Sequence, residues 1–505
     1  MKSGEAGIAS GIARAGWCGW LRGRSASGTR LVYPALVLVL AIFLGFGLAE
    51  VYRVDGLFSY DPHYHMHLSE LVESNQGIVT EIQYFEATEA PQYLTSMHLI
   101  AALIHEYSGV SYLTIYRLLG VFTRLFTALA LFVTVSFFLD DERYGLIAVI
   151  LFLSAPYIFL RSLIGYPENL VLPLHVLIFN SIVHTLKNER ADRALPLYIS
   201  AAIYIHYRSI IVPAVLVGAF AVLLATDRRM KKRFIYLFSL VAGTAALAAP
   251  ILAKVLEQYR SYLKVNVGSG AAWKPFTVGS PAYNVPTINY YLEQLGIPLV
   301  ILSLVGVFAL LRRPGRGGAI LLLWAGFTFI MTRGKQVGLY IPTDRMLSFL
   351  CVPAAVIAAA GVKDILETYA RESLARMTLA ALISLLLLFT LAVNLPGVHG
   401  WVGIGGDRIE AAKWLNDNVQ EESVIIPYKI DLVTMGVKRY KNIAFLSSRE
   451  WKETFDSPDG VRAQIKARYR GHDVYIVSGD EQFRLNGAET VYSREKVTIY
   501  RYAGV

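Results

Sequence analysis

The chain has 505 residues, of which 55% are hydrophobic, and its mean hydropathy is +0.45. Soluble domains are less apolar and rarely reach this length as one unit, so the composition argues against a large soluble protein with long buried helices. The formal net charge is +10, but basic residues accumulate on the cytoplasmic loops of membrane proteins, so this excess does not indicate a nucleic-acid partner.

Apolar stretches recur along the first 395 residues. A helix of about 20 apolar residues crosses a hydrocarbon core of roughly 30 Å. We therefore predict a polytopic α-helical membrane protein with about 11 transmembrane helices, of which the fifth is unusually short. The predicted spans are 32–50, 113–138, 144–160, 169–187, 194–206, 209–226, 234–254, 297–311, 318–332, 345–362 and 377–395.

The basic clusters of the chain predict its orientation, because Lys and Arg are enriched on cytoplasmic loops. With the N-terminus inside, all of them face the cytoplasm: the tail 1–31 and the stretches 187–193, 227–233 and 312–316. The transmembrane domain is then 32–395. The segments predicted on the external side are the loop 51–112, the link 161–168, the loop 255–296 and the tail 396–505.

The first external loop opens with "YDPHYHMHLSELVESNQGI", which is rich in titratable groups. Asp61 followed by a proline predicts a helix start, and the apolar positions that follow predict an amphipathic helix at the membrane interface. Asp61 is either a cap alone or a functional carboxylate. His63 and His67 share a face at i, i+4 spacing, which could bind zinc although a third ligand is missing. His65 is predicted to lie at the surface.

The link between the third and fourth spans, "GYPENLVLP", contains Glu168 at the start of a lipid-embedded helix. A carboxylate there complements the positive end of the helix dipole, but ionisable groups inside membranes are also costly and often functional. Glu168 and Asp61 face the same compartment. Together they could hold a divalent cation or divide general acid and base roles.

Several cations are predicted on the external side, where the distribution of basic residues would not place them. They either contact lipid headgroups as anchors or bind the phosphate of a lipid substrate, for which arginine offers a bidentate fork. These candidates for phosphate binding are His206, Arg208, Arg333, Lys335 and Arg345.

The tail 396–505 is more polar than the spans. It contains three strand-like runs, "SVIIPY", "HDVYIVSG" and "KVTIYRY", and a helix-like segment, "DRIEAAKWLNDNV". Alternating apolar positions bounded by polar residues are typical of strands. We predict a small soluble α/β domain outside the cytoplasm.

These motifs together resemble the C-type (GT-C) membrane glycosyltransferases, and among them the catalytic subunit of archaeal oligosaccharyltransferases. The resemblance rests on the Asp61 motif after the first span, the acidic motif after Gly-Tyr between spans three and four, the segment "PTINYYLEQLG", and Arg345 beside a late span. The Trp-Trp-Asp-Tyr-Gly motif of that subunit is absent from the sequence, which favours a related transferase with a different acceptor.

The resemblance implies transfer of a sugar or oligosaccharide, with inversion, from a polyprenyl-phosphate or polyprenyl-pyrophosphate donor to a protein, glycan or lipid acceptor. It implies Asp61 as general base and Glu168 as a second catalytic carboxylate, with Mg²⁺ or Mn²⁺ as a candidate cation between them. The further candidates on the acceptor side are His63, His67, Tyr166, Asn169 and Tyr283. The alternative is a transporter or flippase of a lipid-linked or small polar substrate, although the sequence shows no repeated halves.

Overall fold

The computed structural model describes most of the helical part of the chain and much of the C-terminal tail. The described residues are 31–54, 56–58, 61–76, 82–84, 87–89, 96–188, 192–206, 210–226, 242–244, 249, 286–333, 343–369, 406–420, 422–428, 443–444, 463, 465, 467–479, 485, 487–494 and 497–503.

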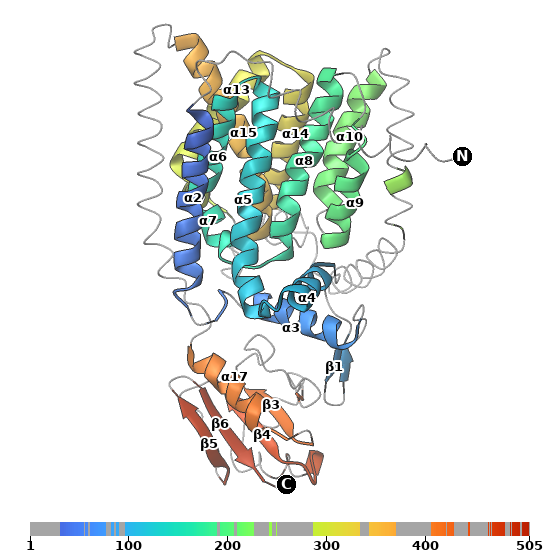
Figure 1. The fold of residues 1–505 in the computed structure, drawn as a ribbon, viewed down its shortest axis with the longest axis vertical. Helices are drawn as coiled ribbons and strands as arrows, with labels where there is room; N and C mark the ends of the chain where they lie inside the picture. Colours follow the sequence, from blue (N-terminus) through green and yellow to red (C-terminus); the bar gives the residue numbers. More distant parts are fainter. Residues whose placement is uncertain are drawn as a thin grey trace, which may run out of the picture.

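A bundle of apolar helices forms the larger part of the molecule (Figure 1). By length and composition, four helices of the described part could cross a membrane, or up to six if each of two bent pairs is one span. The long helices are α2 (Val32–Val51), α5 (Tyr112–Leu139), α8 (Pro167–Asn188) and α15 (Thr343–Tyr369). The shorter apolar helices are α9 (Leu195–Ile205), α10 (Ile211–Thr226) and α14 (Arg316–Thr332).

Helices occur at nine of the eleven predicted spans, and 234–254 and 377–395 lie largely or wholly outside the described residues. The total of eleven spans therefore stays a prediction. The third span is not one helix, as predicted, but two: α6 (Glu142–Ser154) and α7 (Pro156–Ser162) meet at an angle of 72°. Ala155 is extended, because the residue before a proline is disfavoured in helical conformation.

A second broken pair, α12 (Ile288–Leu295) and α13 (Ile297–Arg312), bends by 109° at Gly296. Gly296 has a φ of +84°, which a glycine adopts without strain. Helix α12 contacts α7, so the two broken pairs meet inside the same bundle.

Helices α3 (Asp61–Ser74) and α4 (Ser96–Ser108) lie across one end of the bundle (Figure 1). The helix predicted to begin at Asp61 is confirmed, and it ends at Ser74. Tyr116 of α5 fastens this layer, since its hydroxyl donates to the His65 carbonyl at 2.9 Å and contacts the Ser69 hydroxyl at 2.8 Å. A short hairpin, β1 (Ile82–Tyr84) and β2 (Ala87–Glu89), lies in the connection between α3 and α4.

Beyond this layer, a helix and a four-stranded sheet come from the C-terminal tail (Figure 1). The strand order is β3-β4-β6-β5, with β3 parallel to β4 and the other pairs antiparallel. The predicted helix and three predicted strands are confirmed as elements, and β5 was not predicted. The elements are α17 (Gly406–Asn418), β3 (Val424–Tyr428), β4 (Val474–Ser478), β5 (Glu489–Arg494) and β6 (Val497–Tyr502).

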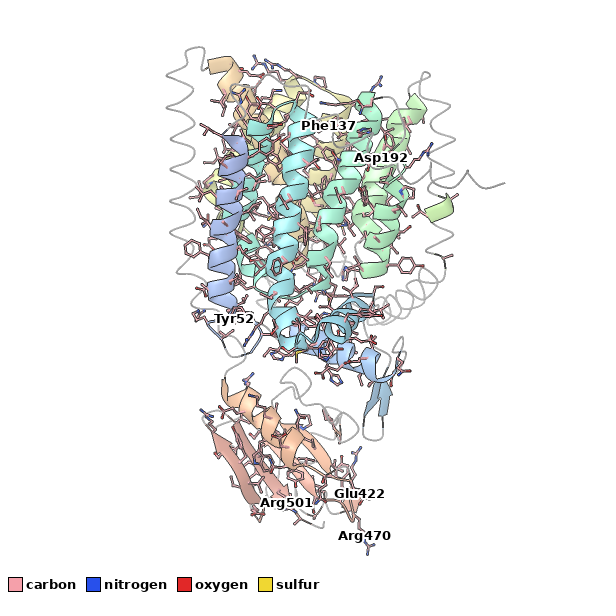
Figure 2. All side chains as sticks on the ribbon, in the orientation of Figure 1. Tyr52, Phe137, Asp192, Glu422, Arg470 and Arg501 are labelled. Carbon is pink, nitrogen blue, oxygen red and sulfur yellow. The ribbon has the colours of Figure 1, made fainter. Side chains whose placement is uncertain are left out.

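One buried apolar cluster joins the C-terminal elements to the α3–α4 layer. It includes Leu68 and Val72 of α3, Ala102 of α4, and Ala411 and Leu415 of α17. Figure 2 shows Arg501 of the sheet at one end of the molecule and Phe137 and Asp192 at the far end of the helical bundle. The α3–α4 layer thus separates the bundle from the C-terminal elements.

Candidate functional site

The turn between α7 and α8 lies against α5, and two glycines allow the approach. A Cβ on Gly120 would come within 2.3 Å of the Ser162 carbonyl oxygen and 2.7 Å of that of Ile164. A Cβ on Gly165 would come within 2.7 Å of the Tyr116 carbonyl oxygen. The predicted Gly-Tyr-Pro break is therefore a close contact between two backbones, and it fixes where α8 begins.

Glu168, in the first turn of α8, is 1% exposed and faces two other predicted residues. Its Oε1 lies 2.8 Å from Nη1 of Arg345, at the start of α15, and 3.6 Å from Nε2 of His206, at the end of α9. The Arg345 side chain is 15% exposed and that of Glu168 only 2%. The structure thus brings together three residues that lie far apart in the sequence.

Arg161 of α7 adds a second guanidinium to this cluster. It is 4% exposed, and its guanidinium carbon lies 4.2 Å from the ring centroid of Tyr166 and 5.7 Å from that of Tyr157. Its positive charge acts on Glu168. Tyr166, a predicted acceptor-side residue, therefore contacts a buried cation of the protein through its ring face.

Asn169 is held by backbone and side-chain contacts at the base of the cluster. Its Nδ2 donates to the carbonyl oxygens of Arg161 (3.1 Å) and Ile164 (2.5 Å), and its Oδ1 accepts from Nη2 of Arg124 (2.7 Å). The residue is 1% exposed. These bonds make Asn169 a connection between α5, the turn and α8, and the acceptor-side role predicted for it stays a prediction.

His65 is buried, with 1% exposure, so its prediction as a surface residue is wrong. Helix α4, which the sequence did not predict, covers it: His65 Nδ1 lies 3.0 Å from His98 Nε2, and the rings stack. Burial lowers the pKa of His65 to about 3 and that of His98 well below its ordinary value. The charges of Glu168, Arg345 and His206 also act on His65, so α3 lies beside the cluster.

His63 and His67 are buried on α3 with different partners. His63 Nε2 accepts from the backbone N–H of Leu57 at 3.3 Å, and burial lowers its pKa to about 4, with the charge of Arg117 adding to the effect. His67 Nδ1 lies 3.4 Å from a carboxylate oxygen of Glu70. Each of the two histidines considered for a zinc site therefore contacts a neighbour of its own.

Arg333, predicted to bind a phosphate, contacts α12 and the segment before it. Its Nη2 donates to the Pro286 carbonyl at 3.0 Å, and its guanidinium lies over the rings of Tyr291 and Phe329 at 6.0 and 5.7 Å. The Tyr291 hydroxyl lies 2.5 Å from that of Thr332. These contacts anchor α12 to the end of α14.

The other predicted site residues are only partly covered by the structure. Asp61 is the first residue of α3, but its side chain lies outside the described residues. Arg208, Tyr283 and Lys335 lie outside them altogether. Their predicted roles therefore stay predictions.

The resemblance to oligosaccharyltransferases implies a candidate divalent cation between Asp61 and Glu168. Arg345 contacts the Glu168 carboxylate and the charge of Arg161 adjoins it, and both oppose a dication there. The Asp61 side chain lies outside the described residues, so the cation stays a prediction. Within the part of the chain that the structure describes, no group of three His, Cys, Asp or Glu side chains could hold a metal ion. Glu168 fits the counter-ion of a guanidinium.

Sequence reasoning missed four members of this region: Arg124, Arg161, His65 and His98. Arg124 and Arg161 carried a usable signal, since each is a charged residue within or beside an apolar stretch. The two histidines carried none, because their burial depends on how α3 and α4 pack together.

No family model matches the chain, and no curated protein sequence matches it. Several solved structures share its fold. The oligosaccharyltransferase of Archaeoglobus fulgidus in the apo form is 13% identical, with a TM-score of 0.64 over 90% of this chain and 70% of that chain. ArnT from Cupriavidus metallidurans bound to undecaprenyl phosphate is 12% identical, with a TM-score of 0.62 over 94% of this chain and 98% of that chain.

The arabinofuranosyltransferase AftD from Mycobacteria is 12% identical, with a TM-score of 0.58 over 94% of this chain and 40% of that chain. Identities this low establish the fold alone. The resemblance to GT-C membrane proteins that the motifs predicted is confirmed at the level of the fold.

Proposed function

We propose that this chain is a membrane glycosyltransferase that moves a sugar or oligosaccharide from a polyprenyl-linked phosphate or pyrophosphate to an acceptor on the external face. The observation that carries the proposal is the buried contact of Glu168 with Arg345, beneath the helix that begins at Asp61. The contact supports the proposal because Glu168 belongs to the second acidic motif, which the sequence predicts on the same side of the membrane as Asp61. A buried ionisable cluster in a membrane protein is a functional-site candidate.

Arg345 is the residue best placed to meet a donor phosphate. Its side chain keeps some exposure, at 15%, whereas that of the carboxylate that holds it is 2% exposed. A guanidinium fixed in this way is a preorganised donor for the charge that develops on a leaving phosphate. His206 lies beside the pair, and Arg208 and Lys335 are further candidates. Arg333 supports the site through α12.

Asp61 is the proposed general base. Its carboxylate takes the proton of an acceptor hydroxyl or amide as that group's electron pair forms a bond to the anomeric carbon. The bond from that carbon to the phosphate oxygen breaks. The electron pair of this bond leaves with the phosphate, whose charge Arg345 stabilises. Attack from the opposite side inverts the anomeric centre. A positioned base is worth roughly 10² to 10⁴-fold in such a step.

The solved neighbours support a lipid-linked donor. One Archaeoglobus fulgidus structure is in complex with an inhibitory peptide and a dolichol-phosphate, and ArnT is bound to undecaprenyl phosphate. Another Archaeoglobus structure, 11% identical with a TM-score of 0.61, is a complex with Zn and sulfate. For this chain we propose a protein, glycan or lipid acceptor. We do not expect this acceptor to be a sequon, because the Trp-Trp-Asp-Tyr-Gly motif that reads a sequon is absent from the sequence.

The proposed placement follows the basic clusters. The tail 1–31 is cytoplasmic, residues 32–395 form the membrane domain, and residues 396–505 form a small α/β domain outside the cytoplasm. The α3–α4 layer, which lies between the bundle and the C-terminal elements, is then at the external interface. A carboxylate at the start of α3 would meet a sugar carried on a lipid headgroup.

The test uses the full chain in liposomes with a labelled lipid-linked sugar extract, and it measures release of free polyprenyl phosphate or pyrophosphate. Asp61→Asn should lower release at least 10²-fold. The matched control is Glu73→Gln on the same helix, where glutamine can still accept from the Tyr112 hydroxyl, 2.8 Å away in the wild type. Release that is insensitive to Asp61→Asn would refute the base assignment. Movement of the lipid-linked sugar across the bilayer without release would favour the flippase alternative.

A further inference from the structure

Arg124 is a charged side chain within an apolar span, and the proposed reaction does not use it. It follows the first residue of α5, Tyr112, by twelve positions, which places it about 18 Å along the helix. Its exposure is 0%. Arginine at such a depth is costly, and it is retained in membrane proteins mainly where it serves a function.

The contacts of Arg124 do not offset the free energy lost when its charge is buried. Its Nη2 donates to Asn169, but Nε and Nη1 have no hydrogen-bond partner among the described residues. The like charge of Arg161 acts on it, and among the described residues Glu168 is the one carboxylate whose charge acts favourably on it. A buried cation whose direct partner is a neutral amide is unfavourable. An apolar side chain of similar volume would satisfy packing at this position equally well.

The bond from Arg124 determines how Asn169 is oriented. Because Oδ1 faces Arg124, Nδ2 faces the carbonyls of Arg161 and Ile164 and closes the turn before α8. Glu168 is the next residue along the chain. A displacement of Asn169 would therefore move the carboxylate that holds Arg345.

We propose that Arg124 is a positioning residue, which fixes the first turn of α8 through Asn169 so that Glu168 orients Arg345 toward the donor phosphate. This inference rests on the proposed function for its last step. The first step, fixation of α8, concerns the protein alone.

Hydrogen exchange of the full chain in detergent tests the first step. Arg124→Met should speed amide exchange in residues 162–170 at least tenfold, while the thermal midpoint stays near that of the wild type. Arg124→Lys, which keeps the charge and a donor, should restore part of the protection. The matched control is Thr127→Val, since Thr127 is also 0% exposed on α5 but donates only to Thr123 of its own helix. Unchanged exchange in Arg124→Met would overturn the proposal. If Arg124→Met does not fold, Asn169→Ala removes the same bond together with the two that Nδ2 donates to the turn, and it should speed exchange in residues 162–170 at least as much.

Binding of undecaprenyl phosphate in nanodiscs tests the second step. Arg124→Met should weaken binding at least tenfold and Thr127→Val less than twofold. The double variant of Arg124→Met and Asn169→Ala should bind no more weakly than Asn169→Ala alone, because Arg124 acts only through Asn169 and has no further effect once that side chain is gone. Faster exchange with unchanged binding would reduce Arg124 to a structural role and overturn the positioning of Arg345. A wild type that neither binds undecaprenyl phosphate nor releases it from donors would refute the proposed function, and the exchange result would still decide whether Arg124 fixes α8.

Discussion

The helical bundle and the C-terminal sheet each hold an arginine against a carboxylate, and the two pairs differ in their surroundings. In the bundle, Arg345 lies 2.8 Å from Glu168, with side-chain exposures of 15% and 2%. In the sheet, Arg501 lies 2.5 Å from Asp473, with exposures of 35% and 22%. The distances are similar, so burial and neighbouring charge separate the two pairs.

Glu168 has further cations around it, whereas Arg501 lies over the ring of Tyr475 at the edge of the molecule. A pair at the surface is screened by water and contributes little. Burying an ion pair costs desolvation energy, and the attraction between the two charges hardly offsets that cost. Stability alone therefore does not explain why the buried pair is present. The contrast is the one that the proposed role of the bundle pair predicts, since the exposed pair in the sheet can be kept at little cost without any function.

The largest expected effect is that of Arg345→Met. It leaves the Glu168 carboxylate buried without its closest partner, and the loss of such a partner costs about 3–5 kcal/mol. His206 and Arg161 still act on Glu168, so the lower end of this range is expected. Turnover should fall about 10² to 10³-fold, as when a preorganised donor is removed. Thermal unfolding in detergent and release of lipid phosphate measure the two effects.

Arg345→Lys is the matched variant, because it keeps the charge and loses the bidentate fork. It should recover most of the stability and only part of the turnover. Wild-type turnover in Arg345→Met would contradict the assignment of the donor phosphate to this residue.

The next effect concerns the close approach of the turn to α5. Gly120→Ala would bring a Cβ against the Ser162 and Ile164 carbonyls, and overpacking of this kind costs about 1–3 kcal/mol. Turnover should fall with it, because this turn fixes the start of α8, where Glu168 lies. The control is Gly218→Ala on α10, where a Cβ meets nothing within 4 Å and the better helix propensity of alanine should stabilise by up to about 1 kcal/mol. Equal thermal midpoints for the two variants would contradict the close contact seen here.

The sequence predicted the features of this region that leave a local pattern, and it did not predict contacts between residues that are distant in the chain. Hydropathy predicted most spans, and the charge within an apolar context predicted Glu168, because both signals are local. Arg345 and Glu168 lie 177 positions apart, and their contact comes from packing that no local pattern contains. The broken third span had a local sign in Pro156, which was outweighed by the continuous apolar run.

The burial of the α3 histidines is a second property that the local sequence pattern did not predict. The pattern of α3 predicts an amphipathic helix with one exposed face, and it predicts His65 at the surface. Helix α4 covers that face, and its segment was predicted only as part of an external loop. A residue's burial follows from its neighbours in space, which explains why the helix was predicted correctly and the environment of His65 was not.

These buried histidines predict a pH dependence in the layer between the two regions. The fold keeps His63 and His65 neutral, with pKa values of about 4 and 3, whereas the unfolded chain takes up protons near pH 6.5. Stability is therefore complete above pH 6.5 and is lost as the pH falls below it. Between pH 7 and pH 5.5 each histidine should cost about 1 kcal/mol. The thermal midpoint against pH measures this.

His65→Gln should reduce the slope of that dependence. A midpoint that is constant from pH 7 to pH 5.5 would show that these side chains are solvated in the folded protein.

The smallest expected effect is that of Arg501→Gln in the sheet. It removes the exposed pair with Asp473 and the contact with the Tyr475 ring, which together are worth about 1 kcal/mol or less. Thermal unfolding should shift by about 2 °C or less, the shift should shrink further in high salt, and release of lipid phosphate should stay at the wild-type rate. A loss of turnover as large as that of Arg345→Met would mean that the sheet contributes to the site across the α3–α4 layer. Burial would then no longer separate the two pairs, and the function of the bundle could not be assigned without its C-terminal elements.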